Sequence, residues 1–392
     1  MSGSPVLGDL VRPGMTVAVA DGSGSPRALY AELSETAARH GDLRLILGWM
    51  PYPEPGLDPA PFADARTVMS GWGLRGLVDR GLVRSVVCRL SAVPALLAGP
   101  LRPDLLLASL VRHDGGLYLG AEVSWMRGLI ESGVPVAAVV STAAPHADAG
   151  PPLPQAAVTV LAEVDDPVRE VPTAVPTETD DRIAAHVAAL VPQGARVQVG
   201  PGRLGAAMLA ALRTPVFVDS GLLPDAVVDL DERGLLLGTP VATFLAGTSR
   251  LHAWAHRRRV LHPIEFTHDP GRLSNGTPLI ALNTAVEIDT SGQVNAEGTA
   301  HAVVGGVGGH PDYAAAAARS PNGLSIVAVA TAHRGVSTLV TRLARPVTTG
   351  AHDVDVVVTE RGAADLRGLS RAERSRAVVE LWNGDVRETD PV

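Results

Sequence analysis

Two stretches of this chain share one local pattern, and the repeat constrains the fold more than any other feature. Each has a short strand rich in valine, at 16–20 and 196–199, followed by a glycine-containing turn and an amphipathic helix. Each half also has a later, continuously apolar strand that follows an aspartate, within 104–108 and within 355–358. Such strands are typical of a sheet that is covered on both faces. The pattern predicts two related open α/β/α domains.

A proline-rich stretch at 143–181 lies between the two halves. Proline is common in segments that join domains, and a helix is expected to restart at the acidic capping cluster 179–181. We therefore predict a first domain at 1–175 and a second at 176–392.

Composition excludes several classes of function. The net charge of −8 and the aromatic content of 3% argue against binding to nucleic acids or to anionic membranes. The chain has no lysine, which removes Schiff-base chemistry, and its single cysteine, Cys88, rules out an internal disulfide and a thiolate metal cage. Cys88 lies in an apolar run and is expected to be buried. No histidine spacing suggests a metal site, and no secretory or membrane-spanning segment is recognisable, so a cytoplasmic protein is expected.

Glycine-rich segments of the second half carry the strongest functional signal. The motif at 283–297 is followed by a glycine run at 305–309 and then by an alanine-rich helix that begins near His310. A strand, a loop without side chains and a helix start allow backbone N–H groups to approach a ligand closely. The alternative is a tight turn that packs a helix on a sheet. The basic cluster 256–259 likewise has two interpretations, a site for nucleotide phosphates or a solvated surface.

Several motifs in the same order resemble the acetyl-CoA hydrolase/acetyl-CoA transferase family, which includes 4-hydroxybutyrate CoA-transferases. Residues 283–295 are similar to its Asn-Ser-Ala-Leu-Glu-Val-Asp-Leu-Thr-Gly-Gln-Val-Asn segment, and 306–313 to its Gly-Val-Gly-Gly-Gln-x-Asp-Phe loop. Residues 358–368 are similar to its Val-Thr-Glu-x-Gly-x-Ala-x-Leu-Arg-Gly segment. In the first half, 22–26 and 114–120 resemble a glycine-rich loop and an acidic segment of the family.

The resemblance implies two coenzyme A-transferase-type domains with the site between them. A coenzyme A thioester would be the substrate or ligand, and no permanently bound cofactor is expected. Family enzymes attack the thioester with a glutamate and form a glutamyl-CoA intermediate. The implied ligand-contacting residues are Gly22, Ser23, Gly24 and Ser25 in the first half, and Gly247, Asn283, Gly305, Gly306, Val307, Gly308 and Gly309 in the second.

The segment that matches the family's glutamate departs from its pattern. Residues 217–230 align with it, and Gly221 occupies the position of the nucleophile. Asp219 replaces a family histidine and would share a face with residue 221 if the run is extended, while His310 replaces a family glutamine. Asp219 and His310 are therefore the candidate catalytic residues, with His310 as a general base. For both, the alternative is sequence drift after loss of activity.

Three functions remain open on the sequence. The first is an enzyme that hydrolyses an acyl-CoA or carrier-protein thioester, or transfers its acyl group directly to a small acceptor, without a glutamyl intermediate. The second is a non-catalytic coenzyme A-binding homologue or partner subunit. The third is a conventional transferase with a displaced nucleophile. Family members are often homodimers, and the sequence shows no interface stripe.

Overall fold

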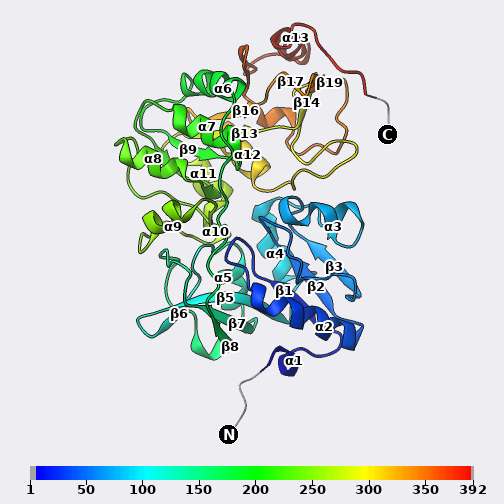
Figure 1. Ribbon diagram of the computed structural model, residues 1–392. Coiled ribbons are helices and arrows are strands. Elements are labelled where there is room, and N and C mark those ends of the chain that lie inside the picture. Colours follow the sequence, from blue (N-terminus) through cyan, green and yellow to red (C-terminus); the bar gives the residue numbers. More distant parts are fainter. Residues whose placement is uncertain (1–5, 390–392) are drawn as a thin grey trace. The chain divides into compact units, whose positions relative to one another are not determined.

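The computed structural model describes residues 6–389, which divide into two compact units (Figure 1). Unit 1 comprises residues 6–171 together with Thr243–Glu265, and unit 2 comprises Pro172–Ala242 together with residues 266–389. Within the described residues, no helix is both long enough and apolar enough to cross a membrane.

Unit 1 is built on an eight-stranded sheet whose neighbouring strands are parallel, except for β6 (Gly116–Tyr118), which pairs antiparallel with β5. The other strands, in spatial order, are β4 (Arg84–Ser85), β3 (Asp64–Thr67), β2 (Arg44–Leu47), β1 (Thr16–Val19), β5 (Leu105–His113), β7 (Val136–Ser141) and β8 (Val158–Val164). The helices are α1 (Leu7–Leu10), α2 (Tyr30–His40), α3 (Arg75–Asp79), α4 (Val93–Ala98), α5 (Met126–Glu131) and α9 (Ser249–Ala255), and α10 (Ile264–Thr267) begins in this unit.

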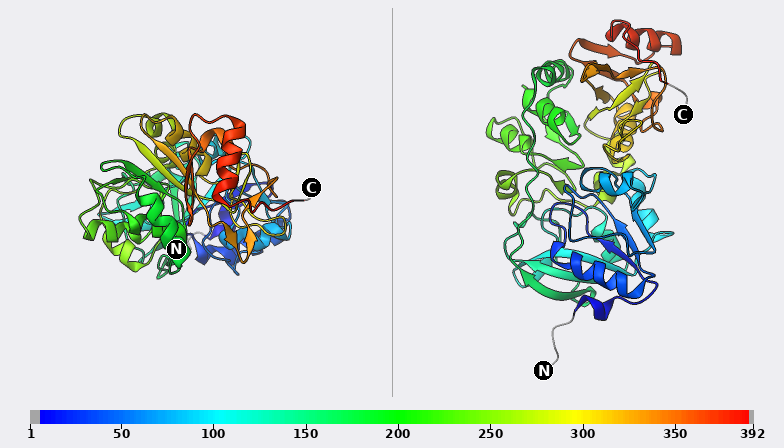
Figure 2. Two further views of the ribbon diagram at one scale, coloured as in Figure 1. Left: turned by 90° about the horizontal axis from the view of Figure 1, so that it is seen from above. Right: turned by 45° about the vertical axis from the view of Figure 1, so that its right-hand side comes forward.

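Both faces of this sheet are covered. Alternate residues of the central strands, such as Val17 and Leu45, form one core with Leu33 and Ala37 of α2. Figure 2 shows that helix, in blue, lying across the sheet. Every residue of β1 and β7 is buried, so the side chains that point to the opposite face are covered as well.

The segment Thr243–Glu265 belongs to unit 1 because its backbone pairs there. The N–H of Val123 donates to the carbonyl of Thr243 (2.9 Å), and the N–H of Leu245, in β12 (Phe244–Leu245), donates to that of Ala121 (3.0 Å). The sequence-based boundary after residue 175 lies close to the observed division at Val171, but it did not anticipate this return of the chain. Local patterns carry no information about such long-range pairing.

Unit 2 contains a six-stranded sheet in which only β21 (Gly362–Asp365) is antiparallel to its neighbour. The others, in order, are β10 (Phe217–Val218), β9 (Arg196–Val199), β13 (Leu279–Thr284), β16 (Leu324–Ala328) and β20 (Val356–Thr359). Smaller elements are β11 (Leu222–Leu223), the sheet β15 (Val294–Asn295), β14 (Glu287–Asp289) and β19 (Leu339–Val340), and the hairpin β17 (Ala332–His333) and β18 (Val336–Ser337). The helices are α6 (Glu178–Ala188), α7 (Arg203–Ala211), α8 (Ala226–Glu232), α11 (Pro270–Ser274), α12 (His310–Arg319) and α13 (Arg371–Leu381).

The predicted fold class is confirmed within each unit. Strands β1 and β9 and the later strands β5 and β20 form where the valine- and leucine-rich runs predict them. Helix α6 starts slightly earlier than expected, because Thr177 caps it through a reciprocal hydrogen-bonded box with Asp180. The expectation of a buried Cys88 was wrong in degree, since this residue is only partly buried.

Candidate active site

Gly221 lies just beyond the carboxyl ends of two parallel strands in unit 2. The preceding residues are anchored to the sheet: the N–H of Asp219 donates to Val197 (3.0 Å), and the Ser220 hydroxyl donates to the carbonyl of Val199 (3.0 Å). Ligands of open α/β sheets bind at this edge. Gly221 is therefore placed where chemistry is expected, but it offers no side chain to take part in it.

An imidazole occupies the space beside this glycine. A Cβ atom added to Gly221 would lie 3.2 Å from both Cε1 and Nε2 of His268. A Cβ atom on Gly309 would lie only 2.5 Å from the same Nε2. The three residues come from distant parts of the sequence and form one packing unit, in which two glycines make room for one buried ring.

His268 is fixed on its other sides. Its Nδ1 hydrogen-bonds with the Thr267 hydroxyl (2.9 Å), and its ring meets the edge of Tyr313 at a centroid distance of 4.9 Å. The Tyr313 hydroxyl in turn donates to the Thr267 carbonyl (2.9 Å). Burial, with a smaller contribution from the charge of Arg272, lowers the pKa of His268 to about 3, so the ring is neutral near pH 7. No sequence motif pointed to this residue.

Asp219 does not face an open space. Its carboxylate binds the guanidinium of Arg272 through two hydrogen bonds (2.7 and 2.8 Å) and that of Arg196 through a third (3.2 Å). The group is buried, and paired buried charges of this kind hold elements in place. This arrangement favours a structural carboxylate over the catalytic one considered from the sequence.

The predicted glycine loop, Gly305–Gly309, leads into α12 as expected. Gly308 has a positive φ of 60°, and Gly309 is the N-cap of the helix. At the start of the loop, the N–H of Gly305 donates to the carbonyl of Glu297 (3.0 Å). The Glu297 carboxylate accepts from the Thr348 hydroxyl (3.1 Å), which gives it a structural partner.

His310, the first residue of α12, is hydrogen-bonded through one of its two ring nitrogens. Its Nδ1 hydrogen-bonds with the Thr349 hydroxyl (2.7 Å), whereas its buried Nε2 has no hydrogen-bonding partner within residues 6–389. Burial lowers the pKa of His310 to about 4, against a smaller opposing contribution from the backbone of Thr284. If Nδ1 carries the proton and donates it to Thr349, Nε2 presents a lone pair, as a general base requires.

Two amides add unsatisfied polar atoms to this part of unit 2. Gln198 donates to the side chain of Asn283 (3.4 Å), which leaves the Gln198 carbonyl oxygen and the Asn283 amide nitrogen buried without partners among the described residues. Buried polar atoms without partners are uncommon and are costly unless a ligand or water satisfies them. Asn283 was predicted to contact a ligand; Gln198 was not.

The glycine-rich loop of unit 1 contacts a buried carboxylate. The N–H of Gly24 donates to the Glu122 carboxylate (3.2 and 3.3 Å), and a Cβ atom on Gly22 would lie 2.6 Å from that carboxyl group. The Gly24 N–H therefore binds a side chain of its own unit. The Ser23 hydroxyl donates weakly to the Leu245 carbonyl (3.4 Å). In the sequence, only its position just after the 114–120 motif drew attention to Glu122.

A second buried carboxylate lies in the same region. Asp21 accepts from the Ser124 hydroxyl (2.7 Å) and from the N–H of Trp49. Burial raises the pKa of Asp21 to about 7 and that of Glu122 to about 8, although hydrogen bonds to both groups act in the opposite direction.

The remaining predicted residues also lie in unit 1. Gly247 accepts a backbone hydrogen bond from Val171 (2.8 Å) just before α9, and Ser25 is buried in the loop. The predicted ligand-contacting residues are thus divided between the units: Gly22–Ser25 and Gly247 lie in unit 1, whereas Asn283, Gly305, Gly306, Val307, Gly308 and Gly309 lie in unit 2 with both catalytic candidates.

Comparison with known proteins assigns this architecture to a class. RipA from Yersinia pestis has the same fold, with a TM-score of 0.86 and 24% identity over 95% of this chain and 91% of that one. A succinyl-CoA:cyclohexane-1-carboxylate CoA transferase from Geobacter metallireducens is 27% identical over 84% of this chain and 80% of the relative. A 4-hydroxybutyrate coenzyme A transferase from Clostridium kluyveri is 26% identical over 80% and 78%, respectively. The fold is therefore that of the coenzyme A-transferases.

A family model matches part of the chain. Residues 247–389 match the model of the acetyl-CoA hydrolase/transferase C-terminal domain, the region that contains the glycine loop and His310. This match agrees with what the motifs of the second half predict, and the chain is similar to coenzyme A transferases over about four fifths of its length.

Proposed function

We propose that the protein binds an acyl-CoA, or another acyl thioester such as one on a carrier protein, and cleaves it by hydrolysis or by direct acyl transfer to a small acceptor. The family and the two transferase relatives support a coenzyme A thioester as the substrate class. The proposed reaction has no glutamyl-CoA intermediate, in contrast to the mechanism that the family resemblance implies.

The observation that carries this proposal is the environment of Gly221. The position that matches the family's nucleophile has no side chain, and the neighbouring space holds the neutral imidazole of His268. The nearby carboxylate of Asp219 is bound by two arginines. A covalent coenzyme A adduct would need a free carboxylate here, and neither Gly221 nor Asp219 supplies one.

Direct attack on the thioester requires only a base. In the proposed step an oxygen of water, or an oxygen or nitrogen of an acceptor, bonds to the thioester carbonyl carbon. The carbon–sulfur bond then breaks, and the departing thiolate takes up a proton. We assign the first proton transfer to Nε2 of His310, because burial keeps this imidazole neutral and Thr349 orients it.

The test is turnover of a panel of acyl-CoAs with and without amine, alcohol and carboxylic acid acceptors, measured as free thiol release and as the intact mass of the protein. We expect thiol release without a coenzyme A adduct. His310→Gln should lower the rate by about 10²–10⁴-fold, the usual contribution of a general base. His301→Gln, which changes an exposed histidine of the same unit, is the matched control and should leave the rate unchanged.

Two results would refute the proposal. A coenzyme A adduct on a carboxylate of the unmodified protein would show a conventional transferase with a displaced nucleophile. Binding of acyl-CoA without turnover would show a non-catalytic homologue.

The assignment of position 221 has its own test. In the double variant Gly221→Glu/His268→Ala, the removed ring makes room for the new carboxylate. If residue 221 corresponds to the family's nucleophile, this variant should acquire a coenzyme A adduct that the His268→Ala single variant lacks. A double variant that folds and binds acyl-CoA, yet never gains the adduct, would contradict the alignment.

A further inference from the structure

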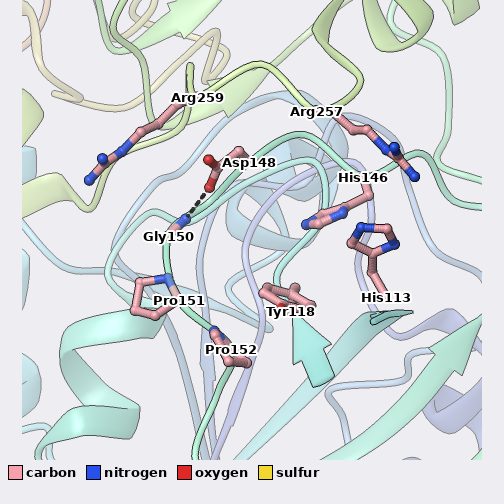
Figure 3. A pocket seen from close by; sticks show the side chains of 9 residues that line it. All are labelled: His113, Tyr118, His146, Asp148, Gly150, Pro151, Pro152, Arg257 and Arg259. Atoms are coloured by element: carbon pink, nitrogen blue, oxygen red, sulfur yellow. Dashed lines mark hydrogen bonds between the residues drawn. The ribbon is translucent and has the colours of Figure 1, made fainter. Parts of the chain in front are cut away.

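Unit 1 contains a cavity of about 480 Å³ that the proposed thioester chemistry does not use (Figure 3). It opens where the loop around His146 meets the segment that follows α9. Backbone hydrogen bonds join the two: the N–H of Arg257 donates to His146 (2.9 Å), and that of Asp148 donates to Arg258 (3.0 Å). Arg257 has a positive φ of 59°, a conformation that these contacts hold in place.

Two arginines line the cavity without carboxylate partners. Arg257 and Arg259 are exposed, and within residues 6–389 no carboxylate forms an ion pair with either guanidinium. Asp148 lies between them in Figure 3, but it accepts a hydrogen bond from the N–H of Gly150 (2.9 Å). Both guanidiniums are therefore available to an anion, and their planar donor groups suit phosphate oxygens.

His146 adds a second, independent feature. Both of its ring nitrogens are buried and have no hydrogen-bonding partner among the described residues. Burial is the main cause that lowers its pKa, and the charges of His113, His256 and Arg257 act in the same direction, whereas Asp148 opposes them. An anion in the cavity would relieve this repulsion and could accept a hydrogen bond from the ring.

The rest of the lining is apolar and aromatic. The Tyr118 ring lies 4.9 Å from that of His146, centroid to centroid, and Pro151 and Pro152 form the adjoining wall. A cavity of about 480 Å³ is much larger than inorganic phosphate requires and falls within the range of small-molecule sites. The ligand should therefore have an organic part that packs against these side chains, in addition to its charged group.

We propose that this cavity is a binding site for a small phosphorylated organic ligand of nucleotide size. The arginines and His146 bind the phosphate, and Tyr118 with the two prolines contacts the organic group. The shared chemistry is a phosphate ester, which either a free nucleotide or the nucleotide end of coenzyme A supplies. The proposal does not depend on the cleavage of thioesters.

Isothermal titration calorimetry of the full chain with AMP, coenzyme A and inorganic phosphate tests the site. We expect saturable binding of AMP or coenzyme A, and the one that binds more tightly identifies the source of the phosphate ester. The double variant Arg257→Gln/Arg259→Gln should weaken this binding by about tenfold or more, as loss of charge-assisted hydrogen bonds does. Arg80→Gln, an exposed arginine elsewhere in unit 1, should leave it unchanged.

Tyr118→Ala separates the two parts of the site, because it should weaken AMP binding and leave the affinity for inorganic phosphate unchanged. Thermal melting of each variant checks that it is folded. The proposal is overturned if neither AMP nor coenzyme A binds the unmodified protein at about 1 mM, the weak end of specific affinities. It is also overturned if the double-arginine variant binds both ligands as tightly as the parent does.

Discussion

Replacing Gly309 by alanine tests the packing around His268 most directly. The new methyl carbon would lie 2.5 Å from Nε2 and 2.8 Å from Cδ2 of a buried ring. Thr267 and Tyr313 hold that ring on its other sides, so it has little room to move away. Overpacking of this kind costs about 1–3 kcal/mol, and the short distances place Gly309→Ala near the upper end.

Gly221→Ala should cost less, about 1 kcal/mol, because its methyl carbon would lie 3.2 Å from the same ring. Gly200→Ala is the matched control in unit 2. There the added carbon would meet only the Leu282 carbonyl oxygen, at 3.9 Å, so the variant should lose little stability. Urea unfolding of the full chain, followed by circular dichroism, gives the three free energies of unfolding.

A double-mutant cycle tests whether the ring of His268 causes the loss of stability in Gly309→Ala. In the His268→Ala background the ring is absent, and the methyl group of Gly309→Ala enters the space that it vacates. The loss of about 3 kcal/mol should therefore shrink to below about 1 kcal/mol, within the range of coupling energies between contacting residues. The reasoning is refuted if Gly309→Ala is as stable as Gly200→Ala, or if its loss is the same with and without the ring.

Three further predictions concern buried titratable side chains. Asp219→Asn should destabilise the protein by about 3–5 kcal/mol in urea unfolding, because it leaves Arg196 and Arg272 without their shared carboxylate. The native pKa of Glu122 is raised by burial from 4.5 to about 8, so the group is neutral in both states below pH 4.5, and its burial destabilises the protein progressively as the pH rises from 4.5 to 8. Glu122→Gln should accordingly melt higher than the parent at pH 9, and the difference should shrink as the pH is lowered from 8 towards 4.5. The pKa of His310 is lowered to about 4, so burial of its neutral ring stabilises the protein above pH 6.5 and this contribution is lost as the pH falls towards 4. The melting temperature of His310→Gln should thus fall less steeply than that of the parent between pH 6.5 and 4.

Local patterns account for much of the fold. The apolar runs that became β1, β5, β9 and β20 are recognisable because burial on both faces of a sheet demands continuous apolar residues. The glycine loop before α12 is equally local, since a run of glycines and an alanine-rich helix follow one another directly. These features depend on residues close together in the chain.

The interactions that could not be predicted from the sequence join residues that are far apart in the chain. Strand alternation placed Asp219 on the same face as residue 221, but nothing nearby in the sequence reveals that Arg196 and Arg272 bind its carboxylate. Glu122 likewise reaches the N–H of Gly24 from far along the chain. A pattern of residue types shows which groups are present, whereas the partner of each buried charge emerges only from the tertiary fold.

Gly221 and His268 depend on each other, and this bears on the proposal that residue 221 takes the position of the family's nucleophile. A side chain at position 221 would begin 3.2 Å from the imidazole and would have to displace it, while the ring itself needs the absence of a side chain at Gly309. The space beside position 221 is thus filled by the ring of His268. A neutral ring with a pKa of about 3 cannot accept coenzyme A as a carboxylate would. Under the proposed function, thioester cleavage therefore proceeds through the neutral base His310.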